Sequence, residues 1–578
     1  MERREDSATE PSNRPINRRA FLQGAASSAL VGGLVDALSQ RAIAQPAGTS
    51  PRDEPFATTG GDAGTVFPQS IASGGPTPSG VLLWTRLSPS IAEEGHSLGV
   101  EVATDESFGA DTLVYRGVVD ESVGPASDHT VTIDLDGILE SDRFYHYRFV
   151  YDGVASETGR CRTLPEYDAS PDRLTLAVLT CQDYQNGYYP AYHHLANTDV
   201  DYLLHLGDFI YEAADGRYRS PSSPAFEDRQ LSLPSGNSLA TTLEDFRYLH
   251  RTYRSDQHLQ SALERHTLIA GWDDHEIANN RYWDDQTGAP VLPPHENGDD
   301  PAFATEVTVN GIQAWVEFMP ERVEYDPSAN ELHERLQLWR RFEFGDLAEW
   351  MITDERLYRD AQPCPDATIT CRTEERADRT MLGAAQKAWF KTILEESDAR
   401  WTVWANEVLT MPLTAGDGAN QIEFLHDSWD GYQAERAELL AHVEDSSVRN
   451  FISVTGDLHA AMAGYQQAGY GEVSWDFDRV GVELMAPPVT SANAADVIDF
   501  PSDWDQALLE EIARDHNEHL AYLDWYAHGY AILDLERDRA TWSVYGVDKN
   551  TNDTENPPEL LASYEIPDGA IELHRQDG

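Results

Sequence analysis

Lysine is nearly absent from this chain of 578 residues. Lys387, Lys391 and Lys549 are the only lysines, and acidic residues outnumber basic ones by 100 to 42, which gives a formal net charge of −58. Such a chain repels nucleic acids and anionic membranes at low salt, so we expect no nucleic-acid partner. A dense carboxylate shell stays hydrated while molar salt screens its self-repulsion. The composition therefore favours a halophilic protein over a merely soluble acidic one.

Cysteine is also scarce, with four residues in the whole chain. Cys364 and Cys371 lie in a polar stretch rich in proline and threonine, and they predict a small disulfide outside the cell. Cys161 and Cys181 have no obvious partners.

Long apolar runs are missing, which excludes a membrane-spanning helix in the mature protein. The one leader-like run, Ala25–Leu38, is interrupted by an aspartate and is too short to cross a bilayer. Arg18-Arg19 precedes it, and Ala42-Ile43-Ala44 follows as a small-x-small cleavage site. This pattern is typical of a twin-arginine export signal over residues 1–44, rather than of a leader with a chance arginine pair. We expect the twin-arginine machinery to export the chain to the periplasm, cell envelope or medium.

The length predicts two domains after the leader. Residues 45–62 are rich in Pro, Gly, Thr and Asp and read as a linker. Residues 63–165 carry short strands with turns, which predicts an N-terminal β-sandwich of the Ig/fibronectin-like kind. The strands expected there are 80–85, 99–102, 112–115, 129–133 and 144–149.

Residues 172–578 alternate strand-like apolar runs with helical segments, which predicts an α/β domain around a buried sheet. We expect helices at 242–262, 384–396 and 432–445 and a long polar loop at 213–240. The strand-like runs are Leu174–Thr180, Tyr202–Leu206, Thr267–Ala270, Thr402–Ala405 and Phe451–Val454.

Residues able to bind a cation or move a proton follow these five runs directly. The segments that follow are Cys181-Gln-Asp183-Tyr, Gly-Asp208-Phe-Ile-Tyr211, Trp-Asp-Asp274-His275-Glu, Asn406-Glu and Gly-Asp457-Leu-His459. Ligands of α/β sheets bind beyond the carboxyl ends of strands, and packing alone would place apolar residues there. Carboxylates suit hard cations, whereas imidazole and thiolate suit transition metals. The pattern therefore predicts a multinuclear metal site, in which a metal-bound hydroxide attacks a phosphate ester.

These motifs, kept in order over nearly the whole mature chain, resemble those of the PhoD-type alkaline phosphatases, which belong to the calcineurin-like metallophosphoesterases. The stretches Ile71-Ala-Ser-Gly-Gly-Pro and Val81-Leu-Leu-Trp-Thr-Arg resemble that family's leading β-sandwich. The resemblance implies a four-layer α/β/β/α catalytic domain with Fe³⁺ held partly by cysteine and tyrosine, and Ca²⁺ nearby. It implies hydrolysis of small phosphate esters.

Carried over by position, the resemblance assigns Cys181 and Tyr211 to ferric iron and Asp208 to a bridge between metals. It places Asp183, Asp274, Asp457 and His459 in further ligand positions. His275 follows a ligand, and it could position the phosphate or protonate the leaving oxygen. Asn279, Asn406 and Arg281 are candidates for substrate contact, although capping, turn or solvated surface roles explain such residues as well.

Two other functions remain open at this stage. A phosphodiesterase of phospholipase D type, acting on phospholipids or teichoic-acid-like diesters, would share the same motifs, because leaving-group specificity lies in loops such as 213–240 and 285–330. A non-catalytic binding protein on a degenerate scaffold would be favoured by loss of Asp208 or His459, but both are present. In isolation, Cys181 could be a small buried hydrophobe and Tyr211 a core aromatic residue.

Overall fold

The computed structural model describes residues 43–44, 55–92, 96–119, 123–221, 224, 226–363, 379–415, 422–423, 425–446, 448–470, 479–498 and 505–576. The predicted export signal, apart from residues 43–44, lies outside the described residues, as do Cys364 and Cys371. Cys161 and Cys181 are buried free cysteines. Within the described segments, no helix combines the length and apolarity needed to cross a bilayer.

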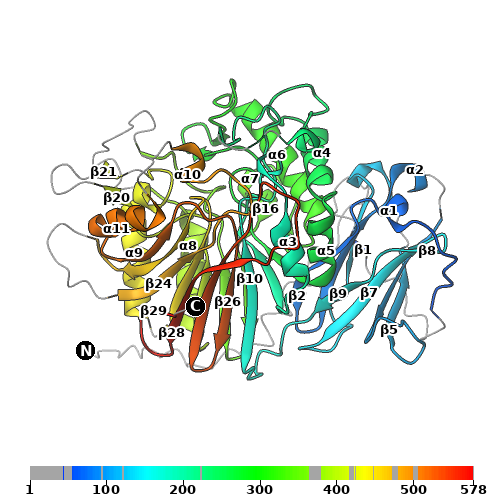
Figure 1. Cartoon of the computed structure of the whole chain (residues 1–578). Coiled ribbons are helices and arrows are strands. Elements are labelled where there is room, and N and C mark those ends of the chain that lie inside the picture. The colour runs from blue at the N-terminus through cyan, green and yellow to red at the C-terminus, as the bar shows by residue number, and fades with distance from the viewer. Residues whose placement is uncertain are drawn as a thin grey trace, which may run out of the picture. The chain divides into compact units, whose positions relative to one another are not determined.

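Two large sheets organise the described part of the chain (Figure 1). The first, sheet A, has the strand order β1 (Ile43–Ala44), β6 (Thr130–Asp134), β3 (Gly80–Arg86), β2 (Ile71–Thr77), β12 (Thr267–Ala270), β11 (Tyr202–His205), β10 (Arg173–Leu179), β26 (Gly529–Glu536), β27 (Arg539–Gly546), β28 (Glu559–Pro567) and β29 (His574–Arg575). The second, sheet F, has the order β17 (Arg340–Phe344), β18 (Ala348–Ile352), β19 (Trp401–Ala405), β22 (Phe451–Thr455), β24 (Arg479–Met485), β23 (Ala461–Gln467) and β25 (Leu520–Asp524).

Smaller sheets complete the strands of the described segments. The N-terminal part contains β4 (Leu98–Ala103), β5 (Leu113–Val118), β7 (Phe144–Tyr151), β8 (Val154–Ala155) and β9 (Gly159–Arg162). Three short hairpins pair β13 (Tyr282–Asp284) with β14 (Ala289–Val291), β15 (Glu324–Tyr325) with β16 (Leu336–Gln337), and β20 (Thr414–Ala415) with β21 (Ile422–Glu423).

The helices pack on the outer faces of the two large sheets. Apolar side chains of α3 (Pro190–Ala196), α4 (Leu243–Tyr253), α5 (Gln257–Arg265) and α6 (Pro301–Phe318) share one core with both sheets. Those of α8 (Gly383–Glu396) and α9 (Gln433–Asp445) form a second core with residues of sheet F such as Met351 and Trp404. The remaining helices of the described segments are the four-residue α1 (Ala63–Val66), α2 (Pro89–Ala92), α7 (Leu332–Arg335) and α10 (Ala494–Val497), together with α11 (Gln506–His516).

The N-terminal strands have a core of their own, yet they also extend sheet A. Apolar residues of β2, β3 and β6 pack against those of β4, β7 and β9 in a separate cluster that includes Cys161. At the same time β2 pairs in parallel with β12, with Gly74 opposite Leu268. Half of the expected N-terminal sandwich is therefore continuous with the sheet that carries the strand ends of interest.

Parallel pairing aligns those strand ends. In sheet A, Leu179 is paired with His205 and His205 with Ala270. In sheet F, Ile352 is paired with Ala405 and Ala405 with Val454. Carboxyl ends of parallel strands lie at one edge of a sheet, so each large sheet presents one rim of loops.

Candidate metal centre

The two rims bring together a first group of donor atoms from three strand ends. Cys181 follows β10, Asp208 follows β11 and His459 follows β22 of the other sheet. One ligand atom of each lies within 4.8 Å of the other two. The backbone joins the first two loops, because the amide of Cys181 donates to the carbonyl of Gly207 over 3.1 Å. Thiolate, carboxylate and imidazole together suit a transition metal.

Two further groups continue from the first. Asp208 belongs also to a group with Asp274 and His275, and Asp274 belongs to a third group with Asp273 and Asp457. In each group the donor atoms lie within 4.8 Å of one another. The shared residues make one connected array of acidic donors, as expected of a site that holds more than one cation.

Tyr211 places its phenol oxygen inside the first group. The hydroxyl donates to Oδ2 of Asp208 over 2.8 Å and lies 3.2 Å from Nε2 of His459. Its ring stacks on His275 with centroids 4.0 Å apart. The phenol oxygen therefore lies beside Asp208 and His459, two members of the first group.

Four of these residues adopt left-handed backbone conformations. The φ angles are +55° for Cys181, +57° for Asp208, +65° for Asp457 and +58° for His459. For residues other than glycine this region is sparsely populated and costs about 1–3 kcal/mol per residue. Such strain persists where the surrounding structure enforces it, and it gathers at functional sites. Here it turns the side chains at the strand ends towards one another.

Burial and crowding of like charges shift the ionisation of the donors. Burial, together with Asp273, Asp274 and Glu276, raises the pKa of Asp208 well above its usual value, although His275 opposes the shift. Burial, reinforced by Asp208, likewise raises the pKa of the Cys181 thiol. Both shifts favour the protonated form of the side chain when no cation is bound. A bound cation reverses that preference, because metal binding releases protons from its ligands.

His275 is held by a buried carboxylate. Nδ1 of His275 lies 2.7 Å from Oε2 of Glu212. The other carboxylate oxygen, Oε1, accepts a 2.7 Å hydrogen bond from the hydroxyl of Tyr218. Burial alone would lower the pKa of His275, but Glu212, Asp208 and Asp274 together raise it well above the usual value. The surrounding carboxylates therefore favour the protonated imidazole beside the donor array.

Arg356 is a central residue that sequence reasoning missed. Its buried guanidinium forms ion pairs with Asp273 and Asp457 and lies 3.4 Å from Oδ2 of Asp274. It thus offsets part of the negative charge of the third donor group, and Asp457, predicted as a metal ligand, is paired with an arginine. Its position is the same kind of clue that indicated the other site residues, because Arg356 follows β18, which is also a parallel strand of sheet F.

Two further supports come from residues that were not predicted as site residues. Glu276 accepts hydrogen bonds from the backbone amides of Asp208, Phe209 and Asp273, which ties two of the rim loops together. The loop 489–493 supports the first group: Ser491 Oγ donates to the Tyr211 hydroxyl over 2.6 Å, and the Ala492 carbonyl lies 2.7 Å from His459 Nδ1. That second contact directs Nε2 of the imidazole towards the site.

Two predicted residues, Asp183 and Asn406, have other partners. The carboxylate of Asp183 accepts from the Gln185 amide over 3.0 Å and from Asn186 Nδ2 over 2.5 Å, and it belongs to none of the three groups among the described residues. Asn406 is buried, with its amide donating to the carbonyl of Val408 and accepting from Trp429 over 3.1 Å.

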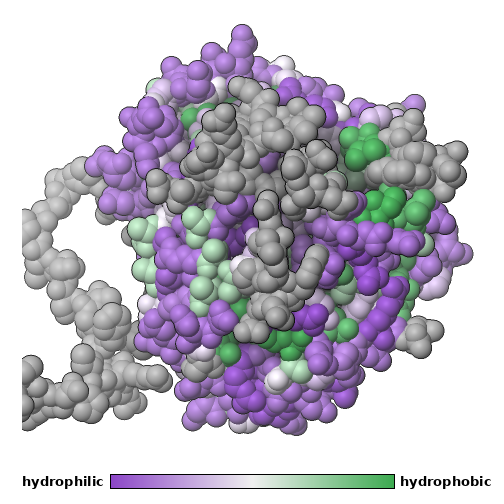
Figure 2. All heavy atoms as spheres, turned by 90° about the vertical axis from the view of Figure 1, so that its left-hand side faces the viewer, coloured by the Kyte–Doolittle hydropathy of each residue, from purple (hydrophilic) through white to green (hydrophobic). Residues whose placement is uncertain are grey.

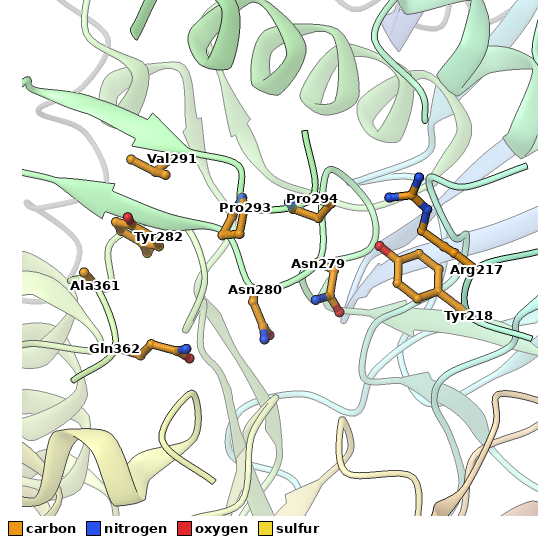
Figure 3. A pocket seen from close by; sticks show the side chains of 10 residues that line it. All are labelled: Arg217, Tyr218, Asn279, Asn280, Tyr282, Val291, Pro293, Pro294, Ala361 and Gln362. Carbon is orange, nitrogen blue, oxygen red and sulfur yellow. The ribbon is translucent and has the colours of Figure 1, made fainter. Parts of the chain in front are cut away.

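The other two predicted substrate contacts differ from each other. Arg281 is buried over the ring of Trp272, and its guanidinium is 3.4 Å from the carbonyl of Asp273. Asn279 instead lines a pocket of about 460 Å³ that opens beside the array (Figure 3). Of the three candidates for substrate contact, the structure brings only Asn279 to this pocket.

Comparison with known proteins agrees with this architecture. Residues 56–165 match the N-terminal domain of PhoD-like phosphatases, and residues 176–544 match the PhoD-like phosphatase domain itself. The chain is 33% identical to alkaline phosphatase D of Bacillus subtilis (strain 168) over 527 residues, which are 90% of this chain and 82% of that protein. A solved structure of PhoD shares the mixed α/β fold with a TM-score of 0.74 and 27% identity, over 91% of this chain and 94% of the other.

These similarities make the chain a phosphoric ester hydrolase. It belongs to the PhoD-like phosphatase family.

Proposed function

We propose that the chain is an exported, metal-dependent alkaline phosphatase of PhoD type acting on small phosphate esters. The observation that carries the proposal is the connected array of donors around Asp208 and Asp274. Cys181, Tyr211, Asp208 and His459 would hold Fe³⁺, and Asp208 with Asp274 would face Ca²⁺. Held by these residues, the cations would supply charge neutralisation for the phosphate and an acidified water as the nucleophile.

The side chains of the site supply orientation and a proton. Glu212 fixes the ring of His275, and the raised pKa keeps a proton on this imidazole. His275 could then stabilise charge on the phosphoryl oxygens or protonate the leaving oxygen. Arg356 offsets part of the negative charge of the third group, which would lessen the repulsion of an anionic ester on that side of the site.

The proposal includes the cellular context and the layout of the chain. Residues 1–44 act as a twin-arginine signal, residues 63–165 form the β-sandwich, and residues 172–578 form the four-layer α/β/β/α catalytic domain. The shared core of sheets A and F, with helices on their outer faces, supports that layering. The net charge of −58 supports a halophilic protein. On the face shown in Figure 2, hydrophilic residues cover most of the described surface.

The decisive experiment changes the residue shared by two donor groups. In Asp208→Asn, a neutral amide replaces the proposed bridging carboxylate, and we expect phosphomonoester hydrolysis to fall by at least ~10³-fold, with loss of bound iron. Asp346→Asn is the matched control. It makes the same change at a half-exposed carboxylate that pairs with Arg537 and belongs to none of the donor groups among the described residues. Full activity of Asp208→Asn in the presence of chelator would refute the metal mechanism.

A further inference from the structure

The pocket beside the donor array is placed to receive the part of a substrate that leaves. The ring of Tyr218, which lines it, meets His275 edge-on with centroids 4.6 Å apart. The backbone amide of Asn280, on the same lining, donates to Oδ2 of Asp274 over 2.7 Å. An ester whose phosphate sits at the array can therefore extend its alcohol into this pocket.

One wall of the pocket is apolar and rigid. It is built by Tyr282 and Val291, which are paired across the β13–β14 hairpin, and by Pro293 and Pro294 shortly after that hairpin (Figure 3). Proline and cross-strand pairing restrict the conformations of this wall, so it is largely formed before a ligand binds. A flat, apolar ligand face would bury well against it.

The rest of the lining is largely polar but offers little net charge. Among the described residues that line the pocket, Arg217 is the single charged one, and its guanidinium is held by Asp215, with Nη2 2.8 Å from Oδ2. Asn279 and Gln362 add neutral amides. Arg217, the positive group that an anionic leaving group would need, is already paired with Asp215. The net charge of −58 on the chain also repels anions.

We propose that this pocket binds the leaving alcohol and selects an uncharged, ring-bearing alcohol over an anionic one. The inference rests on the proposed phosphatase function and adds the class of leaving group. The apolar wall takes the ring face, and the amides of Asn279 and Gln362 bind hydroxyl or carbonyl groups at its edge. The bond cleaved is the phosphorus–oxygen bond, so the alcohol departs with its own oxygen and one proton, and water supplies the oxygen retained on phosphate.

A charge inserted in the wall tests the proposal. Phenyl phosphate and 4-carboxyphenyl phosphate differ by one anionic group, and the carboxylate makes its phenol the slightly better leaving group. We nevertheless expect wild-type kcat/KM to favour phenyl phosphate by about tenfold. Val291→Lys should shift that ratio about tenfold towards the carboxylated ester. Gln286→Lys, an equal charge at the exposed turn of the same hairpin, should leave the ratio unchanged.

A second variant keeps the test decisive if Val291→Lys fails to fold. Tyr282→Ala should lower kcat/KM for phenyl phosphate but not for methyl phosphate, whose leaving group is too small to reach the wall. Equal wild-type rates for both aryl esters, with no response to either pocket variant, would overturn the leaving-group assignment while the phosphatase function stands. Wild-type protein that binds metal but hydrolyses none of the three esters would overturn both.

Discussion

Arg356 offers the sharpest test of the charge balance in the site. Arg356→Met removes a guanidinium that contacts Asp273, Asp274 and Asp457, whose carboxylates lie within 4.8 Å of one another. Removing one partner of a buried ion pair costs about 3–5 kcal/mol. For a chain of this size, that corresponds to a melting temperature lower by roughly 3–4 °C in chelator.

Calcium should compensate for the lost guanidinium. Three unpaired carboxylates are a favourable set for a hard cation, so millimolar Ca²⁺ should raise the melting temperature of Arg356→Met more than that of the wild type. Differential scanning fluorimetry in chelator and in Ca²⁺ measures both effects. Arg359→Met is the control, because this equally buried arginine donates to the carbonyls of Arg281 and Asp427. If both variants melt alike and neither gains from Ca²⁺, the carboxylates are not balanced by Arg356 and the reasoning is wrong.

Three other outcomes follow from the same structure. Lys549 is buried and donates to the Thr490 carbonyl over 2.9 Å and to Asp496 over 2.7 Å. Lys549→Met should therefore loosen the loop 489–493 and lower the iron content of the protein measured by elemental analysis. An unchanged iron content would contradict this prediction. Burial lowers the pKa of His266 to about 4, so the unfolded state binds more protons than the folded state below the ordinary histidine pKa. The free energy of unfolding therefore falls by about 3 kcal/mol as the pH drops from about 6.5 to about 4. Urea unfolding at both ends of that range should show a smaller loss in His266→Gln, and an equal loss would refute the assignment. Dialysis from ~2 M to ~0.05 M NaCl should abolish the near-ultraviolet circular dichroism, whereas a preserved spectrum would argue against a salt-dependent fold.

Much of the framework was readable because buried parallel strands are continuous apolar runs. Thr267–Ala270 was predicted with its observed bounds, and the other four runs differ from the observed strands by one residue at one or both ends. The helix expected over 242–262 is two helices, because Asp256 caps the start of α5 by accepting from two backbone amides. The long helix α6 was not predicted.

The site was harder to predict, because contacts between distant loops decide it. Strand ends indicated Cys181, Asp208 and Asp274, whose convergence depends on the parallel register. No local pattern indicates that the side chain of Asn406 is already hydrogen-bonded to Val408 and Trp429. Nor does any local pattern indicate that Ser491, 280 residues after Tyr211, donates a hydrogen bond to the Tyr211 hydroxyl.

The pairing of β2 with β12 determines how this protein can be divided. At Gly74 an added Cβ would lie 3.1 Å from the carbonyl oxygen of Leu268 in β12 and 2.4 Å from that of Pro320, so there is no room for a side chain where β2 meets these two segments. A fragment starting after residue 165 would expose the edge of β12 as an unpaired template for aggregation. A chimera in which a relative supplies the N-terminal residues 63–165 must therefore keep the pairing of β2 with β12 in sheet A. A flexible linker between the two parts cannot replace that pairing.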